Sequence, residues 1–466
     1  MKVGVVGAGV TGLTAAYELG KLGHRVTLYE RSPFYGGQAS TFELNGARLE
    51  RGYHHLFTGD VSILNLIREI GLGNRLRYID STVGTFCNGR IYDFVTASDL
   101  LKFSPLSFLD RIRLGLVALR LRRMQDWSQL ENITAEEWIL RNAGTEVYSR
   151  FWEPMLRGKF GDDYYQQVGM AWVWGKMHTR FASRKGIFGR EKLVYPIGSF
   201  GEIFDVLADK ILGQGGEIHV SFSVDAIESG ANNELTGLRL SPSPASWTSP
   251  EPLKSSWIED SPEKGSITRS MEIRAQFDAV ISTVSSSAFA KMVPHLPANY
   301  KSKLTGVNYL SAVLVILVLD RPLSDVYWLN VADRSIPFVG VIEQTNLINS
   351  GHYGGKHIVY LSNYVGTNNR LYKLKKDELL SEYIPHLKKI NPSFQASWIQ
   401  DSYYHKVDVA QPIVGVNYSE SIPSHRTPIK GLYLANTTQV YPEDRGTNYS
   451  VRMGKFVAQM LHQDFE

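Results

Sequence analysis

The first thirty residues alternate between apolar runs and a glycine-rich turn. Residues 3–6 are dominated by valine and carry no charge, which predicts a strand buried on both faces at the centre of a parallel sheet. Residues 13–22 repeat apolar side chains at helical spacing, and Gly23 ends that segment. A second apolar run at 25–29 predicts the next strand. The start of the chain therefore predicts a strand–helix–strand unit.

The rest of the chain contains further patterns typical of helices and of strands. Residues 79–187 do not fit the strand–helix alternation of the start and are predicted to be mainly helical. Apolar and β-branched runs predict strands at 277–283, 310–319, 358–361 and 431–436. Helical spacing predicts helices at 61–70, at 379–390 and in a terminal segment through Met453 and Val457. Residues 241–270 are rich in Ser, Pro and charge, which predicts an exposed insertion without a core of its own.

Gly7, Gly9 and Gly12 form a G-x-G-x-x-G turn between the first predicted strand and helix. In such a turn the first glycine allows the tight bend, the second lets a pyrophosphate approach the backbone, and the third lets the helix lie close to the strand. The free N–H groups at the helix start favour an anion. Glu30 ends the second strand about twenty residues later, where a carboxylate accepts hydrogen bonds from ribose hydroxyls. The unit therefore predicts a dinucleotide site.

Composition narrows the classes of function. A length of 466 residues with 43% hydrophobic residues supports a large core and predicts two domains. The net charge of +4, from 50 basic and 46 acidic residues, argues against a nucleic-acid partner. The single cysteine, Cys87, excludes an internal disulfide and a cysteine-rich metal site, and no metal is expected. No window of the sequence is long and apolar enough to span a bilayer, so we expect a cytoplasmic protein.

Residues 103–123 combine apolar groups with a high density of arginine. The arginines are Arg111, Arg113, Arg120, Arg122 and Arg123. One interpretation is an amphipathic segment that rests on anionic lipid or on a phosphate-bearing lipid substrate. Contact with anionic lipid would place the protein peripherally on the inner face of the membrane. The other is a solvated helix face whose apolar stripe lies in the core. Both interpretations stay open.

The glycine turn, Glu30, the Gly36–Gly37 pair and the stretch 52–54 (Gly-Tyr-His) together resemble the flavin-dependent superfamily of amine oxidases, protoporphyrinogen oxidases, phytoene desaturases and UDP-galactopyranose mutases, with protoporphyrinogen-oxidase-like proteins the most similar. The resemblance implies an α/β fold, with a Rossmann-like FAD-binding domain built from discontinuous segments. It also implies an α+β substrate domain with a helical part and an antiparallel sheet. The first domain would comprise 1–78, 190–284 and 422–466, and the second 79–189 and 285–421. The FAD would be non-covalent, since Cys87 lies far from the C-terminal motif.

The same resemblance assigns residues to FAD. The adenine end would lie at Glu30 and at the backbone of Val224, and the flavin ring near residues 52–55. The helix start near Thr447 would face the flavin pyrimidine and stabilise negative charge there. Gln38 departs from the family, which often has Arg or Lys at this position. The full set of expected cofactor contacts is Gly7, Gly9, Thr11, Gly12, Glu30, Arg31, Gly36, Gly37, Gln38, Ala39, Tyr53, His54, Val224, Asn436, Arg445, Thr447, Asn448 and Tyr449.

The leading hypothesis is an FAD-dependent oxidoreductase (an oxidase, dehydrogenase or desaturase) that takes hydride from a small-molecule or lipid-like substrate onto flavin N5. His54 and His55 are candidates for acid–base work because imidazole titrates near neutrality. Arg445 is a candidate for holding a substrate carboxylate or phosphate, or for bracing its acidic neighbours in the turn. Lys159 is a candidate active-site cation or a surface lysine.

Two other functions stay open. The stretch 53–58 also resembles UDP-galactopyranose mutase, in which reduced flavin attacks a sugar nucleotide as a nucleophile without net redox change. A non-catalytic flavin-binding protein is the third hypothesis. The sequence leaves the substrate, the electron acceptor and the oligomeric state undetermined.

Overall fold

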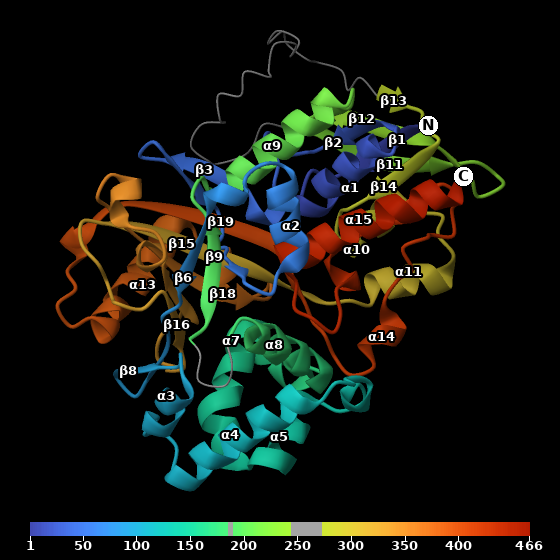
Figure 1. Cartoon of the computed structure of the whole chain (residues 1–466). Helices are drawn as coiled ribbons and strands as arrows, with labels where there is room; N and C mark the ends of the chain where they lie inside the picture. The colour runs from blue at the N-terminus through green and yellow to red at the C-terminus, as the bar shows by residue number, and fades with distance from the viewer. Residues whose placement is uncertain (185–189, 244–272) are drawn as a thin grey trace.

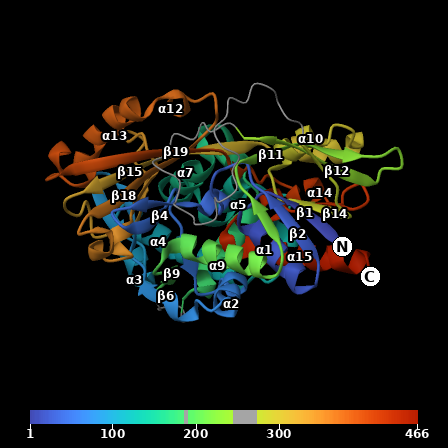
Figure 2. The same ribbon diagram turned by 90° about the horizontal axis from the view of Figure 1, so that it is seen from above.

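The computed structural model describes residues 1–184, 190–243 and 273–466. Parallel strands and their helices lie on one side of the molecule, a larger sheet lies on the other, and a group of helices lies below them (Figure 1). The view from above separates the same two sheets, with the larger one on the left (Figure 2). The two sheets are therefore separate and lie on opposite sides of the molecule.

The five-stranded sheet is parallel throughout, in the order β10-β2-β1-β14-β20. Its strands are β1 (Lys2–Val6), β2 (Arg25–Tyr29), β10 (Glu217–His219), β14 (Ala279–Ser282) and β20 (Leu432–Leu434). Val3 and Val5 of the central strand are fully buried, as β-branched residues are when a parallel strand is covered on both faces. The predicted first unit and the predicted strands near 277–283 and 431–436 are confirmed.

Three helices accompany this sheet: α1 (Val10–Lys21), α9 (Ser199–Gly213) and α15 (Thr447–Asp464). The first and last of them lie side by side (Figure 1). At their contact, a Cβ on Gly454 would lie 2.6 Å from the Thr11 carbonyl oxygen and 2.8 Å from Thr14 Cβ. Glycine at 454 therefore lets α15 pack directly on α1, and α2 (Val61–Glu69) packs on α15 in turn.

The seven-stranded sheet has the order β19-β15-β18-β17-β16-β7-β8. Its strands are β7 (Val83–Cys87), β8 (Arg90–Asp93), β15 (Tyr309–Leu319), β16 (Trp328–Val331), β17 (Gly340–Glu343), β18 (His357–Val365) and β19 (Ile399–Pro412). Every neighbouring pair is antiparallel except β16 and β7. Helix α13 (Lys376–Ile390) contributes Leu379, Tyr383 and Leu387 to the apolar core of this sheet. The strands predicted at 310–319 and 358–361 and the helix at 379–390 are confirmed.

The prediction that residues 79–187 are mainly helical is wrong at its start. Residues 76–80, 83–87 and 90–93 form strands, and β7 and β8 make one edge of the larger sheet. Asn88 and Gly89 join them with φ of +53° and +73°, the left-handed values of a tight hairpin turn. The Asn-Gly pair was the signal for a hairpin at this place.

The helical layer follows β8. It contains α3 (Ala97–Lys102), α4 (Phe108–Arg123), α5 (Ala135–Ala143), α6 (Thr145–Val147), α7 (Glu153–Tyr164) and α8 (Met170–Ala182). Trp152, Phe160 and Trp172 lie in its buried core, as large apolar side chains do when helices pack face to face. Across the part of the chain that the structure describes, no helix has the length and apolar character to cross a membrane.

Short elements connect these parts. They are β3 (Thr41–Leu44), β4 (Ala47–Glu50), β5 (Leu56–Phe57), β6 (Leu76–Asp80), β9 (Lys192–Pro196), β11 (Phe222–Ser229), β12 (Leu235–Pro242), β13 (Ile273–Ala275), α10 (Ser286–Met292), α11 (Ala298–Thr305), α12 (Arg370–Lys373) and α14 (Tyr418–Ser421). Of the insertion predicted at 241–270, residues 241–242 end β12, and 244–270 lie outside the described residues.

Candidate active site

The glycine turn joins β1 to α1 in the conformation that its motif requires. Gly7 has a φ of +100°, which favours glycine. A Cβ on Gly12 would lie 1.9 Å from the Gly7 carbonyl oxygen, so glycine is needed for α1 to start this close to β1. Among the described residues, no side chain caps α1 at Gly9, and its first turn, which contains Thr11, keeps N–H groups for a ligand. The turn therefore fits a dinucleotide pyrophosphate.

The Gly36–Gly37 pair lies against that turn. The Gly36 N–H donates to the Ala8 carbonyl oxygen at 2.8 Å. The two glycines have φ of +102° and +59°, and a Cβ on Gly37 would lie 3.0 Å from Gly9 Cα. Ala39, two residues on, is buried. The Gly-Gly pair predicts a close approach of its backbone to a neighbouring group. In the structure that neighbour is the backbone of the glycine turn.

Glu30 stands beside the same turn. Its carboxylate accepts hydrogen bonds from the backbone N–H groups of Ala8 and Ser32, both at 2.8 Å, while Arg31 points to solvent. Val224 is buried in β11 opposite Leu240, and the strand register shifts just after it. These positions are compatible with a nucleotide that extends from the turn toward β11.

Arg445 joins the N-terminal loop to the larger sheet. Its guanidinium donates to Gln411 Oε1 at 2.9 Å, to Gln38 Oε1 at 3.0 Å and to the Tyr364 hydroxyl at 3.2 Å. Gln38 in turn donates to the Val409 carbonyl oxygen at 2.9 Å. Position 38 therefore lacks a charge of its own but holds the guanidinium of Arg445. The hydrogen bonds of Arg445 go to these neutral groups and not to its acidic neighbours.

Asp444 is a nearly buried carboxylate shared by two lysines. Lys176 Nζ lies 2.9 Å and Lys159 Nζ 3.1 Å from its Oδ2. Burial alone would raise the pKa of Asp444, but the charges of Lys159, Lys176 and Arg445 outweigh it and hold that pKa well below its usual range. Burial lowers the pKa of Lys159. The three cations and one carboxylate leave a surplus of positive charge, and Lys159 is a half-buried residue of this cluster.

Tyr364 and Tyr53 meet at the same place. Their hydroxyl oxygens lie 3.4 Å apart, and Lys159 Nζ lies 5.2 Å from the centre of the Tyr364 ring. Burial raises the pKa of a phenol, yet the charges of Lys159 and Arg445 lower the pKa of Tyr364 below its ordinary value. Tyr364 is therefore the more acidic phenol of the pair.

The two histidines are held in neutral form. His54 Nδ1 donates to the Gly52 carbonyl oxygen at 2.6 Å, and His55 Nδ1 lies 2.9 Å from the Tyr327 hydroxyl. Burial lowers the pKa of His54 to about 4 and that of His55 to about 3. The expectation that these imidazoles titrate near neutrality is wrong, because they leave water for a mostly aromatic environment.

The C-terminal residues predicted to contact FAD make several contacts within the protein. The Asn436 amide donates to the Val284 carbonyl oxygen at 2.9 Å, and Asn448 Oδ1 accepts from the N–H of Ser62 at the start of α2 at 2.9 Å. The Tyr449 hydroxyl lies 3.1 Å from the Thr179 hydroxyl. Thr447 is the first residue of α15 and is nearly buried. This segment therefore ties α2, α8 and the loop before α10 to the start of α15.

One cavity of about 80 Å³ reaches this cluster. Its walls come from α7 and from β7, β16, β17 and β18, and Tyr53, Lys159 and Tyr364 line it. Apolar groups make up much of the remaining wall, including Phe151 and Trp328. The arrangement can hold an apolar molecule with a polar group beside Lys159 and the two phenols.

Sequence reasoning missed several residues of this region: Glu50, Lys176, Tyr364, Gln411 and Asp444. Glu50 is fully buried, accepts hydrogen bonds from Tyr195, Ser199 and the Phe200 N–H, and has its pKa raised by burial. It immediately precedes residues 51–55 and fixes where that stretch begins. Asp444 adjoins the C-terminal motif, so its position in the turn was a signal. The other contacts form between distant segments and had none.

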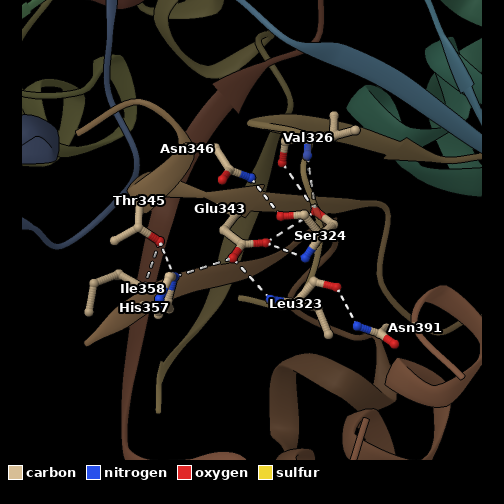
Figure 3. A network of polar contacts seen from close by, with 9 residues as sticks. All are labelled: Leu323, Ser324, Val326, Glu343, Thr345, Asn346, His357, Ile358 and Asn391. Atoms are coloured by element: carbon tan, nitrogen blue, oxygen red, sulfur yellow. Dashed lines mark hydrogen bonds and ion pairs between the residues drawn. The ribbon is translucent and has the colours of Figure 1, made fainter. Parts of the chain in front are cut away.

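Glu343 is another buried carboxylate, outside the cavity lining, at the end of β17 (Figure 3). It accepts hydrogen bonds from the N–H of Leu323 at 3.0 Å and from the N–H of Ser324 at 2.7 Å. The Ser324 hydroxyl donates to it at 3.1 Å, and His357 Nδ1 lies 4.0 Å away. Burial raises the pKa of Glu343 to about 7. This carboxylate ties the loop after β15 to the sheet.

The fold combines a Rossmann-like parallel sheet with a separate, largely antiparallel sheet. The chain belongs to the family described as flavin containing amine oxidoreductase, whose model matches residues 10–443. Family membership brings a flavin cofactor with it. The predicted α/β fold and the predicted resemblance are both confirmed.

Individual proteins share segments or the fold. The chain is 31% identical over 180 residues to zeta-carotene desaturase from Zea mays, a match that covers 33% of this chain and 31% of that protein. It is 28% identical over 174 residues to coproporphyrinogen III oxidase from Propionibacterium freudenreichii, with 34% and 31% covered. The matches therefore span about a third of these relatives. A structure of reduced UDP-galactopyranose mutase aligns with a TM-score of 0.72 at 16% identity over 99% of this chain and 95% of that one, which shows the fold alone.

Proposed function

We propose that this chain is an oxidoreductase that binds FAD non-covalently and removes hydride from an apolar organic substrate. The observation that carries the proposal is the hydrogen-bonded link from Gln38 through Arg445 to Tyr364. Gln38 belongs to the loop beside the glycine turn, and Tyr364 lines the cavity. One guanidinium thus connects the segment expected to hold the cofactor with the space that can hold a substrate.

We infer the domain boundaries from the strand membership of the two sheets. Residues 1–78, 190–284 and 422–466 supply every strand of the parallel sheet, and we assign them to FAD binding. Residues 79–189 and 285–421 supply the seven-stranded sheet and the helical layer, and we assign them to the substrate. The cavity walls come mostly from the second set.

The chain's own residues would divide the work as follows. The bound flavin supplies a hydride acceptor. The glycine turn and Glu30 bind its nucleotide half, and Arg445 braces the loop at Gln38. Lys159 and Tyr364 hold the polar group of the substrate. His54 and His55, whose pKa values burial lowers, would be neutral at physiological pH and would orient the stretch 52–55.

The two other hypotheses have less support. Likeness to UDP-galactopyranose mutase is a likeness of fold, and no contact in the described residues favours a sugar nucleotide over another ligand. Anaerobic mixing with candidate substrates separates the hypotheses. Bleaching of the flavin spectrum supports hydride removal, and turnover only after dithionite reduction supports the mutase. If neither is observed, the non-catalytic flavin-binding hypothesis remains.

Gly9→Val tests the cofactor site. A Cβ on Gly9 would meet only Gly37 Cα, at 3.8 Å, so the first carbon of a side chain makes no clash, while the valine methyl groups would fill the approach of a pyrophosphate. We expect a folded protein with less than about a tenth of the wild-type flavin content, roughly the loss of one tenfold step in affinity or more. Flavin freed by denaturing the wild-type protein, identified as FAD by its mass, would establish the non-covalent form.

Gly213→Val is the matched control, because a Cβ at that end of α9 meets nothing within 4 Å. It should retain normal flavin content. A Gly9→Val protein with wild-type flavin content would contradict the assignment of the glycine turn to cofactor binding.

We also propose that α4 rests peripherally on an anionic lipid surface. Phe108, Leu109 and Leu116 are 62%, 66% and 60% exposed on this helix, which also carries five arginines and one aspartate. Exposed apolar groups beside excess positive charge fit an anionic bilayer surface. We expect flotation with liposomes that contain anionic lipid and its loss in the double variant Leu109→Gln/Leu116→Gln. If the protein does not float with these liposomes, or if it forms dimers through α4 instead, the proposed contact of α4 with lipid is wrong.

A further inference from the structure

The charged groups that line the cavity all carry the same sign. Arg150 is an exposed residue of its wall, and Lys159, which marks what we call the inner end, is a partly buried one. No aspartate or glutamate occurs among the described residues that line it. Its uncharged polar groups include Thr85, Asn330 and Ser362, and the remainder is largely apolar. A ligand in this space therefore meets two cations and no carboxylate.

The positive charge of Lys159 is only partly balanced. Its carboxylate partner, Asp444, is also bound by Lys176 at the shorter distance of 2.9 Å. Arg445, close to the same carboxylate, directs its hydrogen bonds to neutral acceptors. A partly buried cation surplus is costly unless an anion completes it. The inner end of the cavity is therefore prepared for a negative group supplied by a ligand.

A substrate amine would find the opposite environment. An ammonium group at the inner end would lie beside Lys159, and like charges repel most strongly where water is excluded. The phenols of Tyr53 and Tyr364 could accept its hydrogen bonds, but they cannot supply a formal negative charge without losing a proton. The amine named in the family description therefore does not suit the cavity of this chain.

We propose that the cavity binds an apolar substrate through a carboxylate or similar oxyanion held by Lys159, and that it discriminates against amines. This inference rests on the proposed function, since it names the substrate class for that site. Apolar side chains such as Phe151, Met155 and Trp328 contact the body of the substrate. The oxyanion completes the charge balance with Lys159, and the hydroxyl of Tyr364 lies within the same polar end.

Three ligands of equal length test the charge preference: hexanoate, hexan-1-ol and hexylamine. Hexanoate has one apolar carbon fewer than the other two, which should cost it about fourfold in affinity. Tighter binding of hexanoate in isothermal titration of the purified flavoprotein therefore reports the effect of the head group. We expect hexanoate to bind at least about tenfold more tightly than hexylamine, with hexanol between them. Hexylamine binding as tightly as hexanoate, or no measurable hexanoate binding, would overturn the inference.

Variants of Lys159 locate the effect. Lys159→Met should weaken hexanoate about tenfold or more and leave hexanol within about twofold, while Lys159→Arg should retain most of the affinity. Lys455→Met is the control, since Lys455 is likewise a partly buried, ion-paired lysine, bound to Glu18 and Glu69, but does not line the cavity. Unchanged hexanoate affinity in a folded Lys159→Met protein would contradict the proposal. If Lys159→Met does not fold, the affinities of hexanoate and hexylamine are compared in the wild type and in Lys159→Arg. Equal affinities for the two ligands would then contradict the proposal.

Flavin content and flavin reduction, measured on the same samples, separate this inference from the proposed function. Tight hexanoate binding in a protein that never bleaches with any substrate would remove hydride transfer but keep the anion site. Rapid bleaching by simple amines would keep hydride transfer and remove the anion preference.

Discussion

Asp444 and Glu343 are both buried carboxylates, yet their surroundings are opposite. Asp444 is bound by Lys159 and Lys176, and its pKa is lowered against the effect of burial. Glu343 accepts hydrogen bonds from neutral N–H and hydroxyl groups, and burial raises its pKa to about 7. Neutral donors suffice to fasten a loop to a sheet. At Asp444 the cations exceed their carboxylate, and one of them, Lys159, lines the cavity, which fits the binding site proposed there.

Asp444→Asn should have the largest effect. Removal of the carboxylate leaves Lys159 and Lys176 facing each other without a counter-charge, and we expect a loss of roughly 3 to 5 kcal/mol in the free energy of unfolding. The wild-type carboxylate is already ionised above its unfolded pKa, so this loss should be constant between about pH 5 and pH 8. Urea unfolding at both pH values measures it.

The neighbouring variant Glu443→Gln is the control for that loss. Glu443 pairs with Arg452 at the surface, at 3.0 Å, and such pairs contribute about 1 kcal/mol or less. If the two variants were equally stable, the charge cluster around Asp444 would have no special role.

Glu343→Gln should instead show a strong dependence on pH. The folded protein holds the Glu343 proton more tightly than the unfolded chain, so wild-type stability falls as pH rises from about 4.5 to about 7. The glutamine side chain of the variant does not titrate, and the stability of the wild type relative to the variant should therefore fall by about 3 kcal/mol over this window. Parallel urea curves at pH 5 and pH 8 test it, and a difference that does not change with pH would show that Glu343 titrates normally.

Lys176→Met should have the smallest effect on stability. Asp444 keeps Lys159 as a partner, and Lys176 is 37% exposed, so we expect a loss of about 1 kcal/mol. Asp444 would then balance Lys159 alone, and hexanoate affinity should fall about threefold, less than the tenfold loss of Lys159→Met. A loss of stability as large as that of Asp444→Asn would mean that Lys176, not Lys159, is the main partner of the carboxylate.

Local patterns predicted the nucleotide half of the fold well. Gly7, Gly12 and Glu30 act within one strand–helix–strand unit, where the constraints are steric and close in sequence. The hairpin at Asn88 and Gly89 escaped prediction because its strands are only five and four residues long and precede a long helical region. Its turn pair was nevertheless visible in the sequence.

Contacts between distant segments could not be predicted in the same way. Gln38 and Arg445 are 407 positions apart, and Lys176 and Asp444 are 268 apart, so neither pair leaves a local pattern. The lowered pKa values of His54 and His55 likewise depend on the aromatic groups that fold around them. Residue type indicated which groups can do chemistry, and tertiary burial decided which of them are charged.

The contact of α15 with α1 also has a consequence for the timing of biosynthesis. The ribosome makes β1, α1 and β2 several hundred residues before β20 and α15. Until these later elements are translated, the parallel sheet lacks its edge strand β20 and α1 lacks its neighbour α15. Until then the apolar faces of β1, α1 and β2 lack part of their final packing partners. The α1–α15 contact therefore forms late in synthesis, and α1 must stay accessible until α15 has been made.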